Sequence, residues 1–332
     1  MSALAHRAPI GLLLALATTA CSEHPLTTGL TEPISVQGAQ FVEGDLPGLP
    51  PLSSEDIVNG VEPEKPSART PAIELSNLQP GTPAVRFSGQ VTDDALSIGV
   101  KLKGEGTGYW LLPSRDVDVT DPNFLTYDFL ADFHEFVEPG PHVLEVAAFD
   151  ADGHSGNKAE TNICLGSLIP DNGNACEPTK QPPDLVVTLS WDGPADLDLI
   201  VVTPSGKVVD SRNPSTADPD EEGVVDPNQP GVGNLEFDSN RACVIDGAQR
   251  EHLVFQTVPT QARYHIYANL NRACDTDSVR FDLTYHGRVP GKEAGTFDVE
   301  SDVKLTGTLI AAQANGGRQL GTFLTDLKIG AN

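Results

Sequence analysis

Hydrophobic and polar residues alternate along most of the chain after residue 70, for example over 85–91 and 142–149. This period of two is typical of strands with one face on a core and the other toward solvent. The pattern predicts an earlier group of strands at 72–75, 84–92, 97–102, 109–112, 125–129, 141–149 and 158–164. It predicts a later group at 185–191, 198–203, 208–212, 234–238, 251–256, 262–269, 278–286, 295–303 and 318–325.

The short apolar runs are separated by turns rich in Gly and Pro, and this favours sandwiches over helices. We therefore predict an all-β chain with two β-sandwich domains. The first, at 70–165, has the strand number of an immunoglobulin-like sandwich. The second, at 184–332, is expected to be jelly-roll-like, and residues 166–183 form a linker between the two domains.

The first twenty residues have the layout of a bacterial export signal. A short positive end at His6 and Arg7 precedes an apolar run that is too short to span a bilayer, and small residues then lead to Cys21. The segment resembles the lipobox of bacterial lipoproteins, except that Thr18 stands where Leu is usual. This resemblance implies that 1–20 is removed and that Cys21 is acylated, for example with palmitate, and holds the protein on a membrane. A plain secretory signal is the alternative.

In the resembling lipoproteins, Ser22 after the cysteine goes with sorting to the outer membrane. We therefore expect an outer-membrane lipoprotein of the bacterial cell envelope that faces the periplasm or the cell surface.

Residues 21–69 are rich in Pro, Gly and acidic side chains, and no Lys or Arg precedes Lys65 in this segment. Such a segment cannot bury enough apolar surface to offset the entropy of ordering, so it is predicted to be a disordered tether. The alternative is that Phe41-Val42 and Ile57-Val58 form short strands that dock on the folded part.

The chain carries a net charge of -26. This argues against nucleic acid as a partner, because nucleic acid requires a basic patch. An acidic surface instead attracts divalent cations and basic partners.

Acylation of Cys21 would leave four further cysteines in an oxidising compartment. Four cysteines allow three pairings. Sequence proximity favours Cys164–Cys176 and Cys243–Cys274. A metal cluster is the competing interpretation, but the chain has no Cys-x-x-Cys spacing.

The strongest local pattern lies in 190–206, where Trp191 precedes Asp196-Leu197-Asp198-Leu199 and a Pro204-Ser205-Gly206 turn. On a strand, Leu197 and Leu199 would point into a core and both aspartates to the other face. Aspartate is a poor strand former, so a pair on one face calls for a cation, a cap or a hydrogen-bonded turn.

This stretch resembles the YfaP-like family of secreted β-sandwich domains. Two later segments resemble motifs of the same family: Gly233-Asn234-Leu235-Glu236-Phe237-Asp238 and Glu251-His252-Leu253-Val254-Phe255. In the second segment, His252 stands where the family usually has Asn. In the first domain, Gly89-Gln90-Val91-Thr92-Asp93-Asp94 resembles bacterial immunoglobulin-like domains. The YfaP-like family has no established reaction, so the resemblance implies an architecture and a location but no activity.

The paired aspartates suggest a calcium site. We expect Asp196 and Asp198 to bind calcium together with Asp238 or Glu236, because calcium prefers six to eight oxygen ligands and this exported, acidic chain supplies carboxylates. The alternative is that the two aspartates cap the turn before the strand.

These observations favour a non-catalytic binding or structural module of the envelope, with an envelope protein or a polysaccharide as its partner. The first alternative is a calcium-dependent carbohydrate-binding or adhesin-like module. Exposed aromatic rings would favour it, and the candidates are Tyr109, Trp110, Tyr264 and Tyr267. A hydrolase that uses Asp196 and Asp198 is less favoured, because catalytic carboxylates usually come from different strands.

Overall fold

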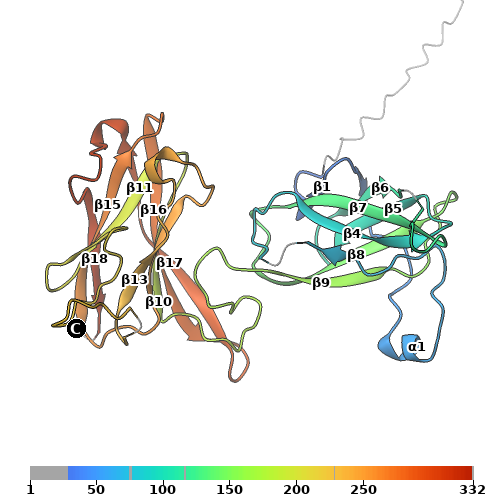
Figure 1. The fold of residues 1–332 in the computed structure, drawn as a ribbon, viewed down its shortest axis with the longest axis horizontal. Coiled ribbons are helices and arrows are strands. Elements are labelled where there is room, and N and C mark those ends of the chain that lie inside the picture. Colours follow the sequence, from blue (N-terminus) through green and yellow to red (C-terminus); the bar gives the residue numbers. More distant parts are fainter. Residues whose placement is uncertain (1–28, 75–76, 116, 228, 331–332) are drawn as a thin grey trace, which may run out of the picture.

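The computed structural model describes residues 29–74, 77–115, 117–227 and 229–330. The described chain is almost entirely β-structure, which confirms the predicted all-β fold class. Figure 1 shows two β-sandwiches that follow one another along the chain. Their main buried clusters share no residue, so each sandwich has a core of its own. The signal segment 1–20 and Cys21 lie outside the described residues.

The first sandwich packs a four-stranded antiparallel sheet, in the order β1-β7-β4-β3, on a five-stranded sheet, in the order β2-β6-β5-β8-β9. Its strands are β1 (Ile34–Val36), β2 (Gln40–Glu43), β3 (Ala72–Ile73), β4 (Val85–Thr92), β5 (Ser97–Leu102), β6 (Gly108–Pro113), β7 (Phe124–Phe133), β8 (Gly140–Phe149) and β9 (Ala159–Leu165). All seven strands predicted for 70–165 are present.

The predicted tether is wrong over the described part of 21–69. β1 pairs with β7 and β2 pairs with β6, so this segment supplies an edge strand to each sheet of the first sandwich. Ile34 and Val36 are buried in the core, and Glu32 is buried where its carboxylate accepts hydrogen bonds from the backbone N–H and the hydroxyl of Thr107. The composition missed this because edge pairing needs backbone hydrogen bonds and few apolar residues.

The alternative reading of the same segment is confirmed for one of its two pairs. Phe41 and Val42 lie in β2. Ile57 and Val58 instead lie in the short helix α1 (Ser54–Val58), where both are exposed. Ser53 caps α1 in a capping box with Asp56.

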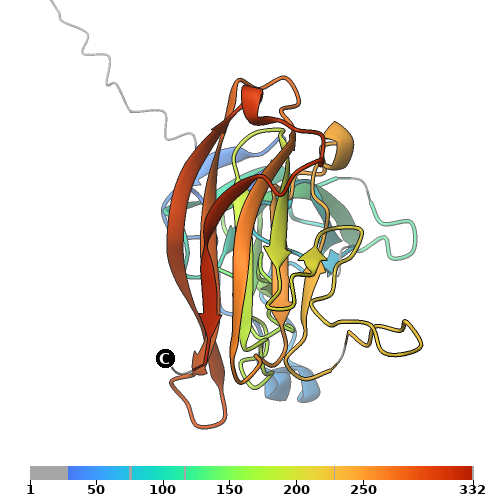
Figure 2. The same ribbon diagram turned by 90° about the vertical axis from the view of Figure 1, so that its left-hand side faces the viewer.

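The second sandwich packs a five-stranded sheet, in the order β13-β14-β10-β16-β17, on a four-stranded sheet, in the order β12-β11-β15-β18 (Figure 2). Its strands are β10 (Leu185–Trp191), β11 (Asp196–Val202), β12 (Val208–Val209), β13 (Gly233–Glu236), β14 (Arg250–Phe255), β15 (Ala262–Arg272), β16 (Ser278–Pro290), β17 (Phe297–Ile310) and β18 (Thr322–Ile329). Two single 3-10 turns, η1 (Arg241–Cys243) and η2 (Ala311–Gln313), complete it. Each of the nine predicted strands has a counterpart.

The predicted linker, 166–183, is hydrogen-bonded to both sandwiches. The side-chain amide of Gln79 donates to the carbonyl of Ser167, and the backbone N–H of Gly166 donates to the carbonyl of Leu78. On the other side, the amide of Asn172 donates to Gln256 and the amide of Asn174 donates to the carbonyl of Phe297. The segment is therefore an ordered connection.

Both predicted disulfides are present. Cys164 and Cys176 have Cα atoms 5.9 Å apart, and Cys243 and Cys274 have Cα atoms 5.5 Å apart. The first disulfide closes the connection between the sandwiches, and the second ties the segment after β13 to the end of β15. No helix within the described residues is long and apolar enough to cross a membrane.

Candidate metal site

β11 separates its aspartates from its leucines as the sequence predicts. Leu197 and Leu199 are fully buried in the core of the second sandwich. Because side chains alternate along a strand, Asp196 and Asp198 lie on the opposite face. The indole N–H of Trp191 donates to the carbonyl of Ala195 at 2.9 Å, so the tryptophan of the motif fixes the turn that leads into the aspartates.

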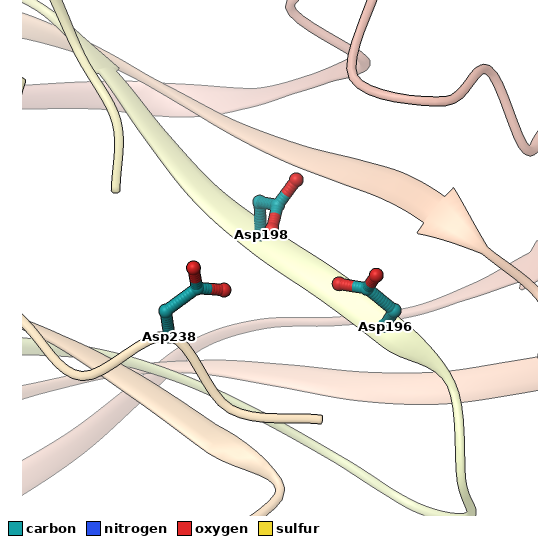
Figure 3. Close-up of side chains that lie close together, drawn as sticks. All are labelled: Asp196, Asp198 and Asp238. Atoms are coloured by element: carbon teal, nitrogen blue, oxygen red, sulfur yellow. The ribbon is translucent and has the colours of Figure 1, made fainter. Parts of the chain in front are cut away.

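A third aspartate comes from the segment after β13. Phe237 has a φ of 71°, a left-handed conformation that turns the chain out of the sheet just before Asp238. One carboxylate oxygen each of Asp196, Asp198 and Asp238 lies within 4.8 Å of the others. Figure 3 shows the carboxylates of Asp196 and Asp238 directed toward one another, with Asp198 beside them on β11.

Asp196 is only 1% exposed, and its two oxygens differ in their surroundings. One oxygen accepts a hydrogen bond from the backbone N–H of Ala242 at 2.8 Å. The other, Oδ1, is buried without a hydrogen-bond partner in the described part of the chain. A buried carboxylate oxygen without a partner is costly, so this atom marks a position where a cation would be stabilising.

The three negative charges in the cluster repel one another. Burial, and then the carboxylates of Asp196 and Asp238, raise the pKa of Asp198 to about 7. Burial also raises the pKa of Asp196, and the hydrogen bond from Ala242 only partly offsets this effect. Without a cation, the folded protein therefore holds these groups in an unfavourable state at neutral pH.

The segment that carries Asp238 is held in place by its own polar network. Asn240 is fully buried, and its amide donates to the carbonyl of Ala195, the same carbonyl that the indole of Trp191 contacts. The carboxylate of Asp246 accepts hydrogen bonds from the backbone N–H of Asn240 and from the hydroxyl of Ser239. The Cys243–Cys274 disulfide adds a covalent link, so hydrogen bonds and a disulfide together hold the segment that carries Asp238 in position.

Sequence reasoning missed Glu251, a carboxylate that is 1% exposed in β14. One of its oxygens accepts a hydrogen bond from the backbone N–H of Leu199 at 2.6 Å, which links the two sheets. Its other oxygen has no partner among the described residues, and burial followed by the charge of Asp198 raises its pKa well above the usual range. The signal was present, because a period of two places Glu251 on the same face as Leu253 and Phe255.

The structure does not bring Glu236 to the cluster. Leu235 faces the core, so the next residue of β13 faces outward, where Glu236 lines a cavity on the far side of its sheet. Of the two expected partners of Asp196 and Asp198, the geometry therefore selects Asp238.

The aromatic residues considered for sugar stacking do not form an exposed platform. Trp110 and Tyr264 are buried in the two cores. Tyr109 and Tyr267 are half-buried, and Tyr109 is stacked on Phe149 while Tyr267 packs edge-on against Phe323.

Three carboxylates without cysteine or histidine form a donor set of hard oxygen atoms. Such a set suits calcium or magnesium, and calcium is the better candidate because its flexible coordination makes smaller geometric demands on three carboxylates than the strict octahedron of magnesium. The residues present therefore fit the expected ion.

No family model matches the chain, and no curated protein matches it. Among solved structures, the chain is similar to two endo-fucoidan hydrolases of glycoside hydrolase family 107, MfFcnA4 and MfFcnA9, with 10% and 14% sequence identity and TM-scores of 0.18 and 0.14. These matches cover 73% and 71% of this chain but only 29% and 34% of those proteins, so the chain spans about a third of their length. Similarity at this level supports no argument about activity.

Proposed function

We propose that the chain is a non-catalytic binding or structural module of the bacterial cell envelope, and that a calcium ion bound by Asp196, Asp198 and Asp238 stabilises its second sandwich. The observation that carries the calcium proposal is the meeting of three carboxylates within 4.8 Å of one another, together with the buried Oδ1 of Asp196, which has no hydrogen-bond partner among the described residues. The role of the ion is structural, because it neutralises the cluster and ties the segment after β13 to β11.

Thermal unfolding of the full chain in calcium and in chelator tests this proposal. Calcium should raise the unfolding temperature by an amount that grows with free calcium, since only the folded chain gathers these ligands. The double variant Asp196→Asn/Asp198→Asn should lose this dependence and keep its fold. In chelator it should be more stable than the native chain, because the repulsion within the cluster is gone.

The matched control is Glu221→Gln/Glu222→Gln. It removes the same number of charges from an exposed loop of the same sandwich. This variant should respond to calcium as the native chain does. An unfolding temperature of the native chain that is the same in calcium and in chelator would exclude a bound ion and leave Asp196 and Asp198 with the turn-capping role alone.

We further propose that acylated Cys21 attaches the module to the outer membrane and that its second sandwich belongs with the YfaP-like domains. The export-signal layout before Cys21 supports the first proposal, and the motif of Trp191, Asp196 and Asp198 supports the second. Replacing Cys21 with Ser should move the protein from the membrane fraction to the soluble envelope fraction. Unchanged membrane association of this variant would contradict the anchor.

A further inference from the structure

A cavity of about 710 Å³ lies where the two sandwiches and their connection meet. Its size falls within the range of about 300–1,000 Å³ that is usual for small-molecule sites. The connection supplies Leu168 and Ile169, and the second sandwich supplies Glu236, Phe237, Arg250 and His252. Apolar and polar side chains thus both line the cavity, and Asp171 of the connection is a further carboxylate in its wall.

The walls of this cavity are braced. The connection is closed by the Cys164–Cys176 disulfide and is hydrogen-bonded to the first sandwich through Gln79 and to the second through Asn172. His252 is buried, and its Nδ1 lies 2.9 Å from the hydroxyl of Thr188. A ligand would thus meet a largely preformed site, which lowers the entropic cost of binding.

Two opposite charges line this cavity, on Arg250, which is half-buried, and on Glu236, which is exposed. Within the described part of the chain, neither the guanidinium of Arg250 nor the carboxylate of Glu236 makes a direct hydrogen bond or ion pair, although the carboxylates of Asp246 and Glu135 lie near enough to act on the charge of Arg250. Glu236 pairs with His252 across the two strands, so Arg250, two residues away, is its diagonal neighbour. Diagonal neighbours on one face of a sheet have Cα atoms about 7–8 Å apart, which leaves room for a small group between their side chains.

We propose that this cavity binds a free α-amino acid with an apolar side chain, with the ligand carboxylate on Arg250 and the ligand ammonium on Glu236. An α-amino acid carries both charges on one carbon atom, so it can reach both groups at once. A guanidinium forms paired hydrogen bonds with a carboxylate, and a carboxylate accepts from an ammonium. Phe237, which is 58% exposed, and the connection residues Leu168 and Ile169 would contact the apolar side chain. This proposal goes beyond the calcium proposal and does not depend on it.

Titration calorimetry on the full chain tests the proposal with L-phenylalanine and two matched derivatives. N-acetyl-L-phenylalanine lacks the ammonium group, and L-phenylalaninamide lacks the carboxylate. L-Phenylalanine should bind, and each derivative should bind about tenfold more weakly or worse, because each loses one of the two charge-assisted contacts in the cavity.

Single variants assign each charge. Arg250→Gln should weaken the binding of L-phenylalanine and abolish the preference for it over the amide, and Glu236→Gln should abolish the preference for it over the acetylated form. The controls Arg280→Gln and Glu300→Gln change exposed residues of β16 and β17 and should leave binding unchanged. Thermal unfolding of each variant shows whether it is folded.

Three outcomes would overturn the proposal. The first is that neither L-phenylalanine nor L-leucine binds to the folded native chain. The second is that both derivatives bind as tightly as the parent amino acid. The third is that trigalacturonate binds in place of the amino acids, which would assign the cavity to an acidic saccharide.

Discussion

Arg250 and Glu251 are consecutive residues of β14 with different roles. Glu251 faces inward and accepts a hydrogen bond from the backbone N–H of Leu199 in the facing sheet. Arg250 faces outward and lines the cavity beside the connection. The end of β13 and the segment after it divide in a similar way, because Glu236, the last residue of β13, lines the cavity and Asp238 joins the acidic cluster. The short stretch from Glu236 to Asp238 therefore contributes to both candidate sites.

The first prediction concerns the pH dependence of stability in chelator. The pKa of Asp198 is about 7 in the folded chain, above its usual value of 3.8, so the folded state binds more protons than the unfolded state between these values. The contribution of Asp198 to stability must then fall as pH rises from about 4 to 7, by up to about 4 kcal/mol. Denaturant unfolding of the native chain and of Asp198→Asn, compared at several pH values, isolates this contribution. An equal pH dependence of both proteins would contradict it.

The second prediction concerns the two disulfides. Each disulfide stabilises the folded chain by reducing the entropy of the unfolded chain. The expected stabilisation is about 3–4 kcal/mol for Cys243–Cys274, which spans 31 residues, and about 3 kcal/mol for Cys164–Cys176, which spans 12. Replacing Cys243 and Cys274 with Ser should also reduce the response to calcium, because it frees the segment that carries Asp238. Replacing Cys164 and Cys176 with Ser should leave that response intact. Calcium titrations of both variants by thermal unfolding make the comparison.

The third prediction concerns Asn240, the buried residue that holds the segment after β13 to the turn before β11. Asn240→Ala removes its hydrogen bond to the carbonyl of Ala195 and leaves that buried turn with fewer donors. We expect a loss of about 1–3 kcal/mol in the free energy of unfolding and weaker calcium binding. Asn213→Ala, at an exposed turn, is the control and should leave calcium binding unchanged. Native-like calcium binding by Asn240→Ala would show that the network does not position Asp238.

The fourth prediction tests whether the segment before residue 70 is part of the first sandwich. Glu32→Ala removes the carboxylate that accepts hydrogen bonds from Thr107, and should destabilise the chain by about 1.5–3 kcal/mol. Glu55→Ala, an exposed change in α1, should cost far less. Denaturant unfolding measures both. A loss from Glu32→Ala no greater than that from Glu55→Ala would mean that the segment is dispensable.

The sequence alone predicted much of the fold, because the side-chain period of a strand is local. The alternation around Val85 and Phe87 predicted β4, and the run from Leu185 to Trp191 predicted β10. The same alternation placed Asp196 and Asp198 on one face of β11. Proximity along the chain was also sufficient to pair the cysteines.

Other features depended on tertiary structure. The strand of residues 34–36 was not predicted, and the strand of residues 40–43 was predicted only as an alternative, because their pairing uses backbone groups whose partners in β7 and β6 lie far along the chain. The choice of Asp238 over Glu236 depended on the left-handed conformation of Phe237, which no hydrophobic pattern encodes. The cavity at Arg250 exists only because the connection and the second sandwich meet there. The sequence thus determined the strands and their faces, and only packing decided which of those faces meet, because contacts between distant segments have no local period.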